Sequence, residues 1–260
     1  MENAVLFKVK KGVATITLNR PDRYNAVNQD LVDGISNSLK KCEVDETIRA
    51  VVITGAGRGF CAGADMSVFG DGVTADQRSQ YLIDQYQPLM NQFFSLKKPI
   101  IGAINGTAAG VGAAFALACD FRVMSDQSGI LYAFVNIGLG PDGGASWLLA
   151  RQVGYSRALE IATSGKKVTG QKCLELGLTN RIVAQDDILS NAQSWAEDFA
   201  IRPTLAIGIA KEDMFFAMDH SLNEAIAFEA KKQIDAFNSH DLKEGVSAFI
   251  EKRNPNFLGK

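Results

Sequence analysis

The feature that most constrains the fold of this chain is a repeated order of short apolar strand, glycine-rich loop and helix. The apolar run Ala50–Gly55 leads into the loop 55–65, "GAGRGFCAGAD", and Ile100–Ile104 leads into the loop 105–112, "NGTAAGVG". A third glycine-rich loop lies within 136–149 and follows another apolar run. Alternating strands and helices predict a largely parallel sheet with both faces covered. The sequence therefore predicts an α/β protein.

The segments before the first loop have clear periodicities. β-Rich residues fill 5–9 and 13–18 with a Lys-Gly pair between them, which predicts a hairpin. Asn28 is suited to cap a helix, because apolar residues recur at helical spacing through "NQDLVDGISNSLKKC". We expect a further long helix over about 76–95.

The pattern changes after residue 147 to helices with few strands. From about residue 187 to the end the chain is predominantly helical, and the stretches "LNEAIAFEAKKQIDAF" and "DLKEGVSAFIEKR" are amphipathic. Their apolar stripes are expected to pack on the core or on another subunit. A shift of composition near residue 200, before Pro203, predicts a core over 1–200 and a helical region over 201–260.

Composition narrows the class of protein. The 260 residues carry a formal net charge of −2, which provides no basic field for a nucleic-acid partner. The N-terminus lacks an export signal, so we expect a cytoplasmic protein. The chain has four cysteines, and their scattered positions fit reduced thiols better than a disulfide framework. They are Cys42, Cys61, Cys119 and Cys173.

One stretch has the length of a membrane span. Segment 99–119 is uncharged over 21 residues and carries glycines at G-x-x-x-G spacing. A turn at Asn105-Gly106-Thr107 splits it into a short strand and a later helix. The segment is therefore interpreted as buried core, and no membrane partner is expected.

The third loop contains the dinucleotide-binding spacing G-x-G-x-x-G at Gly138, Gly140 and Gly143. Pro141 removes one N–H group, and Asp142 places a carboxylate where a phosphate would lie. No nucleotide cofactor is therefore expected. Two interpretations of Asp142 stay open at this point: a cap for the following helix, or a catalytic acid.

The other two glycine loops bear on this choice. Their small residues permit close approach of a ligand, and N–H groups at a helix start converge on an oxygen that gains negative charge. Two such loops and one carboxylate suffice to stabilise an enolate and to move a proton.

The motifs "FCAGADM", "KPIIGAINGTAAGVGAAFALACD", "IGLGPDGGASWLLARQVG" and "EGVSAFIEKRNPNF" resemble the enoyl-CoA hydratase/isomerase (crotonase) superfamily over nearly the whole chain. The resemblance implies a spiral of repeated β-β-α turns, a C-terminal helical trimerisation region, and a homotrimer or dimer of trimers. It implies an acyl-CoA thioester substrate, with coenzyme A as part of the substrate and no separate cofactor. The thioester oxygen would be held by the backbone N–H groups of Ala64 and Val111.

Two positions depart from the family's hydratases. These enzymes use two glutamates to add water, whereas this chain has Ala114 and Phe134 at those places. The loop "NIGLGPDGG" is similar to Δ3,Δ2-enoyl-CoA isomerases and to ring-epoxide isomerases of phenylacetate breakdown. It is also similar to 4-chlorobenzoyl-CoA dehalogenases, but those carry tryptophan at position 134 and histidine in place of Gln87. We therefore expect an isomerase in which Asp142 is the acid and base.

The resemblance also suggests the surroundings of the acid. An acyl pocket formed by Phe134, Ala114 and Trp147 should exclude water and raise the pKa of Asp142. No metal is expected. Candidate coenzyme A contacts, each equally readable as a surface charge or a packed aromatic, are Arg20, Arg23, Ala62, and, from a neighbouring subunit, Phe249 and Lys252. Two alternative functions stay open: a residual hydratase (lyase) in which Asp142 positions water, and an inactive acyl-CoA-binding module.

Overall fold

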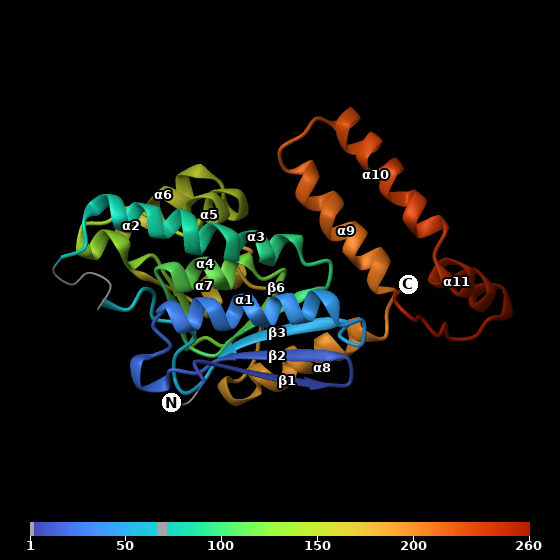
Figure 1. The fold of residues 1–260 in the computed structure, drawn as a ribbon, viewed down its shortest axis with the longest axis horizontal. Coiled ribbons are helices and arrows are strands. Elements are labelled where there is room, and N and C mark those ends of the chain that lie inside the picture. Colours follow the sequence, from blue (N-terminus) through green and yellow to red (C-terminus); the bar gives the residue numbers. More distant parts are fainter. Residues whose placement is uncertain (1–2, 67–71) are drawn as a thin grey trace.

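The computed structural model describes residues 3–66 and 72–260 (Figure 1). Its main sheet has six strands in the order β1-β2-β3-β4-β6-β9, and every neighbouring pair is parallel except the antiparallel pair β1–β2. The predicted, largely parallel α/β architecture is confirmed. The strands are β1 (Val5–Lys10), β2 (Val13–Leu18), β3 (Ala50–Gly55), β4 (Ile100–Ile104), β6 (Phe121–Met124) and β9 (Arg181–Ile182).

The first two strands form the predicted hairpin. Lys11 and Gly12 connect them, with φ of 51° and 75°. Two consecutive left-handed residues are the geometry of a two-residue turn that follows the right-handed twist of the strands. Glycine adopts this conformation without a steric penalty, which explains its place in the turn.

Helices cover both faces of the sheet because alternate strand residues point to opposite sides. Ala50 and Val52 pack against α8 (Ile188–Ala200) in one apolar cluster. Val51 and Ile53 face the opposite, larger cluster. Three helices supply its other side, as Figure 1 shows: α1 (Gln29–Val44), α3 (Gln87–Ser95) and α4 (Val111–Ala118).

A second, smaller sheet carries the second glycine loop. It consists of β5 (Thr107–Ala109), β7 (Gly129–Leu131) and β8 (Lys167–Thr169). The sequence indicated only a loop over 105–112, because alanine and glycine have little strand preference. Pairing with β7 gives this segment its extended conformation, so tertiary contacts override the local tendency.

The helix expected over 76–95 is interrupted in its middle. It comprises α2 (Ala75–Tyr81), a π-helical turn η3 (Leu82–Tyr86) and α3. Pro88 lies at the start of α3 and has no N–H group to donate one turn back. The N–H of Gln87 donates instead to the carbonyl of Leu82, five residues earlier. Such π turns often occur at functional sites.

Segment 99–119 lies inside the core. It forms β4, β5 and α4, and the residues of β4 and α4 are all buried. Over residues 3–66 and 72–260, the structure contains no helix with the length and apolar character needed to cross a membrane. The four cysteines are buried and unpaired, as the scattered spacing predicted.

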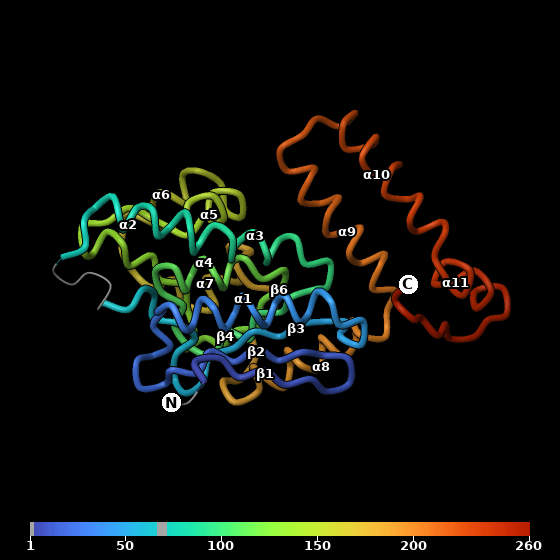
Figure 2. The backbone as a smooth tube through the Cα atoms, viewed as in Figure 1, coloured from blue at the N-terminus to red at the C-terminus, as the bar shows by residue number. Residues whose placement is uncertain are grey.

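Three helices follow Pro203 and extend away from the sheet, as Figures 1 and 2 show: α9 (Thr204–Ala217), α10 (Leu222–Phe237) and α11 (His240–Glu251). The first of them is joined to the core by an ion pair of 2.9 Å between Lys211 and Asp120. Phe215 also stacks on Phe94 with ring centroids 5.0 Å apart. The domain boundary at residue 200 stays a prediction.

We predict that Gly112→Ala destabilises the fold. A methyl group on Gly112 would lie 2.6 Å from the carbonyl oxygen and 2.7 Å from the Sγ of Cys61, so the start of α4 must move. Overpacking of this kind costs about 1–3 kcal/mol. Thermal denaturation followed by circular dichroism measures the effect. Gly140→Ala is the matched control, because no atom lies within 4 Å of the added methyl; equal melting temperatures for both variants would contradict the prediction.

Candidate active site

The first two glycine loops run side by side. The N–H of Cys61 donates to the carbonyl of Thr107 at 3.3 Å, and the N–H of Ala109 donates to the carbonyl of Cys61 at 2.8 Å. Beyond this bridge the backbones come closer still. A Cβ on Gly63, whose φ is 94°, would lie only 2.9 Å from the carbonyl oxygen of Ala109. Glycine is therefore required where the loops meet.

Ala64 is held so that its own N–H group faces away from its neighbour strand. Val27 donates to the carbonyl of Gly63 at 2.7 Å and accepts from the N–H of Asp65 at 2.9 Å. Ala64 lies between Gly63 and Asp65 in this parallel bridge, so its own N–H group points away from Val27. The backbone hydrogen bonds among the described residues include none donated by Ala64, and Ala64 lines a cavity.

Val111 is the first residue of α4. Its N–H is one of the terminal groups without an intrahelical acceptor, and it lies at the positive end of the helix dipole. Gly110 precedes it with a φ of 54°, and a Cβ there would lie 3.6 Å from the Cα of Gly63. The residues that precede Ala64 and Val111 are thus in contact. Two main-chain N–H groups so placed are suited to stabilise an oxyanion.

The third loop brings Asp142 to the same place. A Cβ on Gly143 would lie 2.8 Å from Cγ2 of Val111, so the loop touches the start of α4. Asp142 and Ala64 line one cavity of about 1040 Å³. Within the described part of the chain, the buried Oδ1 atom of Asp142 has no hydrogen-bond partner. Loss of hydration raises the pKa of Asp142 to about 6.

The interpretation of Asp142 as a helix cap is wrong. Helix α5 (Ala145–Val153) has Gly144 at its N-cap, and no side chain caps it. Asp142 supports the turn only through its main chain, since its carbonyl accepts from the N–H of Ala145 at 2.9 Å. Its carboxyl group is left on the cavity wall.

The rest of the cavity wall is mainly apolar. Helix α2 and the π turn contribute Tyr81, Leu82 and Tyr86, while the third loop contributes Ile137 and Leu139. These side chains keep water away from the carboxylate, and this loss of hydration explains the raised pKa of Asp142. The sequence did not single out the two tyrosines, because a tyrosine at helical spacing is typical of a core residue.

Of the predicted pocket residues, Phe134 and Ala114 belong to the packing beneath the loops. Phe134 is buried, and its ring lies 3.9 Å from the Cβ position of Gly110. Ala114 is fully buried within α4. The described side chains on the wall of the Asp142 cavity do not include either residue. Neither side chain can move a proton.

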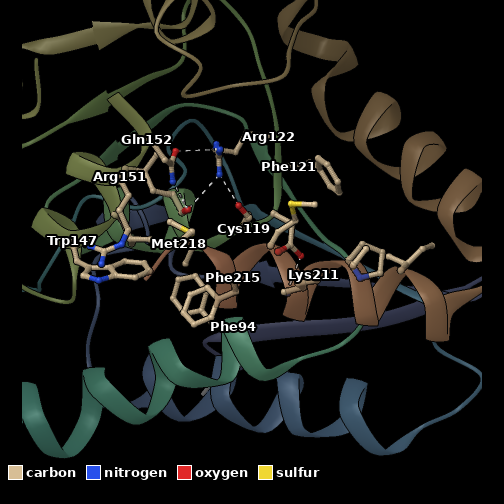
Figure 3. A pocket seen from close by; sticks show the side chains of 18 of the residues that line it. Phe94, Cys119, Phe121, Arg122, Trp147, Arg151, Gln152, Lys211, Phe215 and Met218 are labelled. Carbon is tan, nitrogen blue, oxygen red and sulfur yellow. Dashed lines mark hydrogen bonds and ion pairs between the residues drawn. The ribbon is translucent and has the colours of Figure 1, made fainter. Parts of the chain in front are cut away.

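Trp147 does not lie where we expected it. It lines a separate cavity of about 600 Å³ between the core and α9 (Figure 3). The Arg151 guanidinium lies 3.9 Å from the centre of its ring, and the rings of Phe94 and Phe215 pack beside it. The assignment of Trp147 to the acyl pocket is corrected, because α5 turns this side chain toward α9.

The candidate coenzyme A residues lie in three different settings. Arg20 pairs with Asp65 at 2.9 Å and donates to the carbonyl of Ala26, so it supports the first loop beside Ala64. Three others are exposed: Arg23, Ala62 and Lys252. Phe249 is 85% exposed on α11. Their coenzyme A contacts stay predictions.

Sequence reasoning missed Asn25, which is fully buried with a φ of 58°. Its side-chain Nδ2 donates to the carbonyls of Ala56, Gly59 and Phe60 at 2.9–3.1 Å. It therefore fixes the course of the first glycine loop. An asparagine within "NRPDRYNAV" is typical of a surface loop, so no local signal distinguished it.

Among residues 3–66 and 72–260, no group of three histidine, cysteine or acidic side chains could hold a metal ion. The polar side chains that the structure places around the cavity include one carboxylate and two phenols, together with Gln77, Arg78 and Ser79 of α2, and Ala64 also lines it. This set is suited to proton transfer next to an oxygen that gains charge.

Comparison with known proteins gives the family. The family model "Enoyl-CoA hydratase/isomerase" matches residues 8–260. The 1,2-epoxyphenylacetyl-CoA isomerase of Escherichia coli K12 is 38% identical over the whole of both chains. The short-chain-enoyl-CoA hydratase of Clostridium acetobutylicum is 30% identical over 97% of this chain and 96% of its own. The chain belongs to the enoyl-CoA hydratase/isomerase family.

Solved structures agree with this assignment. An enoyl-CoA hydratase from Bacillus anthracis superposes with a TM-score of 0.93 at 28% identity, covering 99% of this chain and all of its own. The predicted crotonase-type α/β fold with a C-terminal helical region is confirmed. The protein is thus an enzyme of the enoyl-CoA hydratase/isomerase family.

We predict that Asp142→Asn stabilises the protein at neutral pH. The pKa of Asp142 is about 6 in the folded protein against an ordinary value of 3.8, so the folded state binds more protons between these limits. The contribution of Asp142 to the free energy of unfolding therefore falls as pH rises through this window. Chemical denaturation should show Asp142→Asn more stable by about 1–3 kcal/mol at pH 8. The difference should vanish below about pH 4, and a difference independent of pH would contradict this account.

Proposed function

We propose that the protein is an acyl-CoA isomerase that moves a double bond, with Asp142 as its single acid and base. The observation that carries this proposal is the arrangement of the cavity wall. Among its described side chains, Asp142 is the one carboxylate, and it lies where three glycine loops meet. Hydratases of the family use two glutamates, and the matching places hold Ala114 and Phe134.

The reaction begins with ionised Asp142. It removes a proton from the carbon between the thioester and the double bond, and negative charge moves to the thioester oxygen. The N–H groups of Ala64 and Val111 donate to that oxygen and stabilise the dienolate. Asp142 then returns the same proton two carbons further along the chain. The double bond moves into conjugation, and no net proton is exchanged.

The raised pKa suits this cycle. A carboxylate of ordinary pKa is a weak base toward an acidic C–H group, whereas a desolvated one is stronger. At a pKa of about 6, Asp142 is still mostly ionised at neutral pH. One side chain can therefore take up the proton and release it.

Isomerisation of a ring epoxide carried as a thioester is a second candidate. Two observations favour it. The 1,2-epoxyphenylacetyl-CoA isomerase of E. coli aligns over the whole chain at 38% identity. In addition, Tyr81 and Tyr86 meet edge to face on the cavity wall, with ring centroids 5.5 Å apart. Such rings are suited to contact an aromatic acyl group.

We further propose that the protein forms a homotrimer or a dimer of trimers. The helices beyond residue 203 expose large apolar side chains that a monomer would leave in water. Examples are Leu222 at 75%, Phe249 at 85% and Ile250 at 72% exposure. A second copy of the chain would cover them, and would also bring Phe249 and Lys252 toward a neighbouring site.

We predict that Asp142→Asn abolishes isomerisation. General acid–base catalysis contributes about 10²–10⁴-fold, so kcat should fall by at least that range while the Kd of the thioester changes little. In the wild type, kcat/KM should rise with pH up to about 6 and then level off, because the base must be ionised. The exposed Asp186, as Asp186→Asn, is the control.

The assay uses three thioesters side by side. Conversion of trans-3-enoyl-CoA supports double-bond isomerisation, and conversion of a phenylacetyl-CoA ring epoxide supports the second candidate. Formation of 3-hydroxyacyl-CoA from a 2-enoyl ester would support a hydratase. Binding without turnover of any thioester would support an inactive module. Full activity of Asp142→Asn would refute the assignment of the base.

We predict that Phe249→Asp disrupts the oligomer. A charge on this side chain, which is 85% exposed in one protomer, opposes burial against another copy. Light scattering after size exclusion should report a smaller mass than the wild type. Val44→Asp is the control, since Val44 is 79% exposed but lies at the end of α1 on the core. A wild-type protein that is already monomeric would contradict the proposed assembly.

A further inference from the structure

Tyr86 is an unused polar group at the candidate active site. It ends the π turn, lines the cavity that holds Asp142, and is only 3% exposed. Its ring is fixed edge-on against Tyr81 at 5.5 Å and against Phe115 at 6.4 Å. A Cβ on Gly143 would lie 3.7 Å from its Cδ2 atom, so the third loop also touches the ring. The side chain is therefore held rigidly beside the acid.

The hydroxyl group of Tyr86 has no hydrogen bond to any described residue. It is not one of the fully enclosed atoms that lack a partner, so it stays accessible from the cavity that Tyr86 lines. A buried tyrosine hydroxyl normally finds a partner. Tyr132 in the same chain follows this rule, because its hydroxyl donates to the carbonyl of Ala145 at 2.8 Å. The free donor of Tyr86 is thus available to a molecule in the cavity.

The phenol remains a hydrogen-bond donor over the whole working range of pH. Burial raises the pKa of Tyr86 strongly, and the nearby carboxylate of Asp142 acts in the same direction. Tyr86 and Asp142 therefore share one electrostatic environment. Within the described residues, however, no hydrogen bond joins them. A group that enters the cavity can meet the carboxylate and the phenol at once.

We propose that Tyr86 determines specificity by donating a hydrogen bond to an oxygen atom of the acyl group beyond the thioester carbonyl. The preferred substrates are then acyl-CoA thioesters with an epoxide, hydroxyl or keto oxygen near the carbons that Asp142 serves. An acyl group without such an oxygen leaves the phenol unpaired against an apolar wall. This inference rests on the proposed function, namely that the cavity receives the acyl group.

Binding of two unreactive thioesters tests the proposal without turnover. The pair is phenylacetyl-CoA and 2-hydroxyphenylacetyl-CoA, which differ by one ring oxygen, and calorimetry gives both Kd values. Wild type should bind the hydroxylated ligand about 10-fold more tightly, which corresponds to one hydrogen bond to a buried neutral donor. Tyr86→Phe should remove this preference. Tyr81→Phe, a second tyrosine on the same wall, should retain it.

Each result separates the possibilities. A specificity effect changes the ratio of the two Kd values, whereas a merely structural effect of Tyr86→Phe weakens both ligands alike. A wild type without preference, or a preference that survives in Tyr86→Phe, overturns the inference and leaves the proposed function intact. If the wild type binds neither thioester yet converts trans-3-enoyl-CoA, the inference alone fails. If it neither binds these two thioesters nor converts trans-3-enoyl-CoA or a phenylacetyl-CoA ring epoxide, the proposed function fails as well.

Discussion

The close approach of two glycine loops is the constraint on which the site depends. Gly63 and Gly110 are in contact, and a side chain on Gly63 would push the loops apart, because its Cβ would lie 2.9 Å from the carbonyl oxygen of Ala109. Gly106 adds to this, since a Cβ there would lie 2.2 Å from the carbonyl of Arg58. The contact brings together the residues that precede Ala64 and Val111, whose N–H groups are the proposed oxyanion donors. A main-chain N–H group cannot be reoriented by a change of rotamer, so the packing of the two loops sets its position.

Polar side chains that are hydrogen-bonded or ion-paired hold these loops in place. Asn25 donates to three carbonyls of the first loop, and Arg20 pairs with Asp65 next to Ala64. On the cavity side the opposite holds, because the buried Oδ1 atom of Asp142 has no hydrogen-bond partner among the described residues. A buried carboxylate without a partner costs stability, and such costs are typical of residues kept for function. The contrast between the two sides indicates where a ligand belongs.

Much of the fold could be predicted from local pattern. The hairpin at Lys11-Gly12, the capped helix after Asn28 and the buried strand Ala50–Gly55 all have strong local signals, and each is present. Two elements could not be predicted in detail. The strand Thr107–Ala109 exists only through its partner strands, and the π turn arises where Pro88 meets the packing of the helix around it. Asn25 and Trp147 were placed wrongly or not at all, since polar and aromatic side chains take their role from distant neighbours.

The sequence by itself determined the family, the α/β class, and the presence of a lone acid between glycine loops where other members carry glutamates. These properties are encoded in residue identity and spacing, which local chemistry can interpret. Only the tertiary structure decided that Asp142 faces the cavity rather than capping α5, that Trp147 lies against α9, and that Tyr86 joins the acid on one wall. Side-chain direction and hydration depend on contacts between segments far apart in the chain, and no short stretch of sequence contains them.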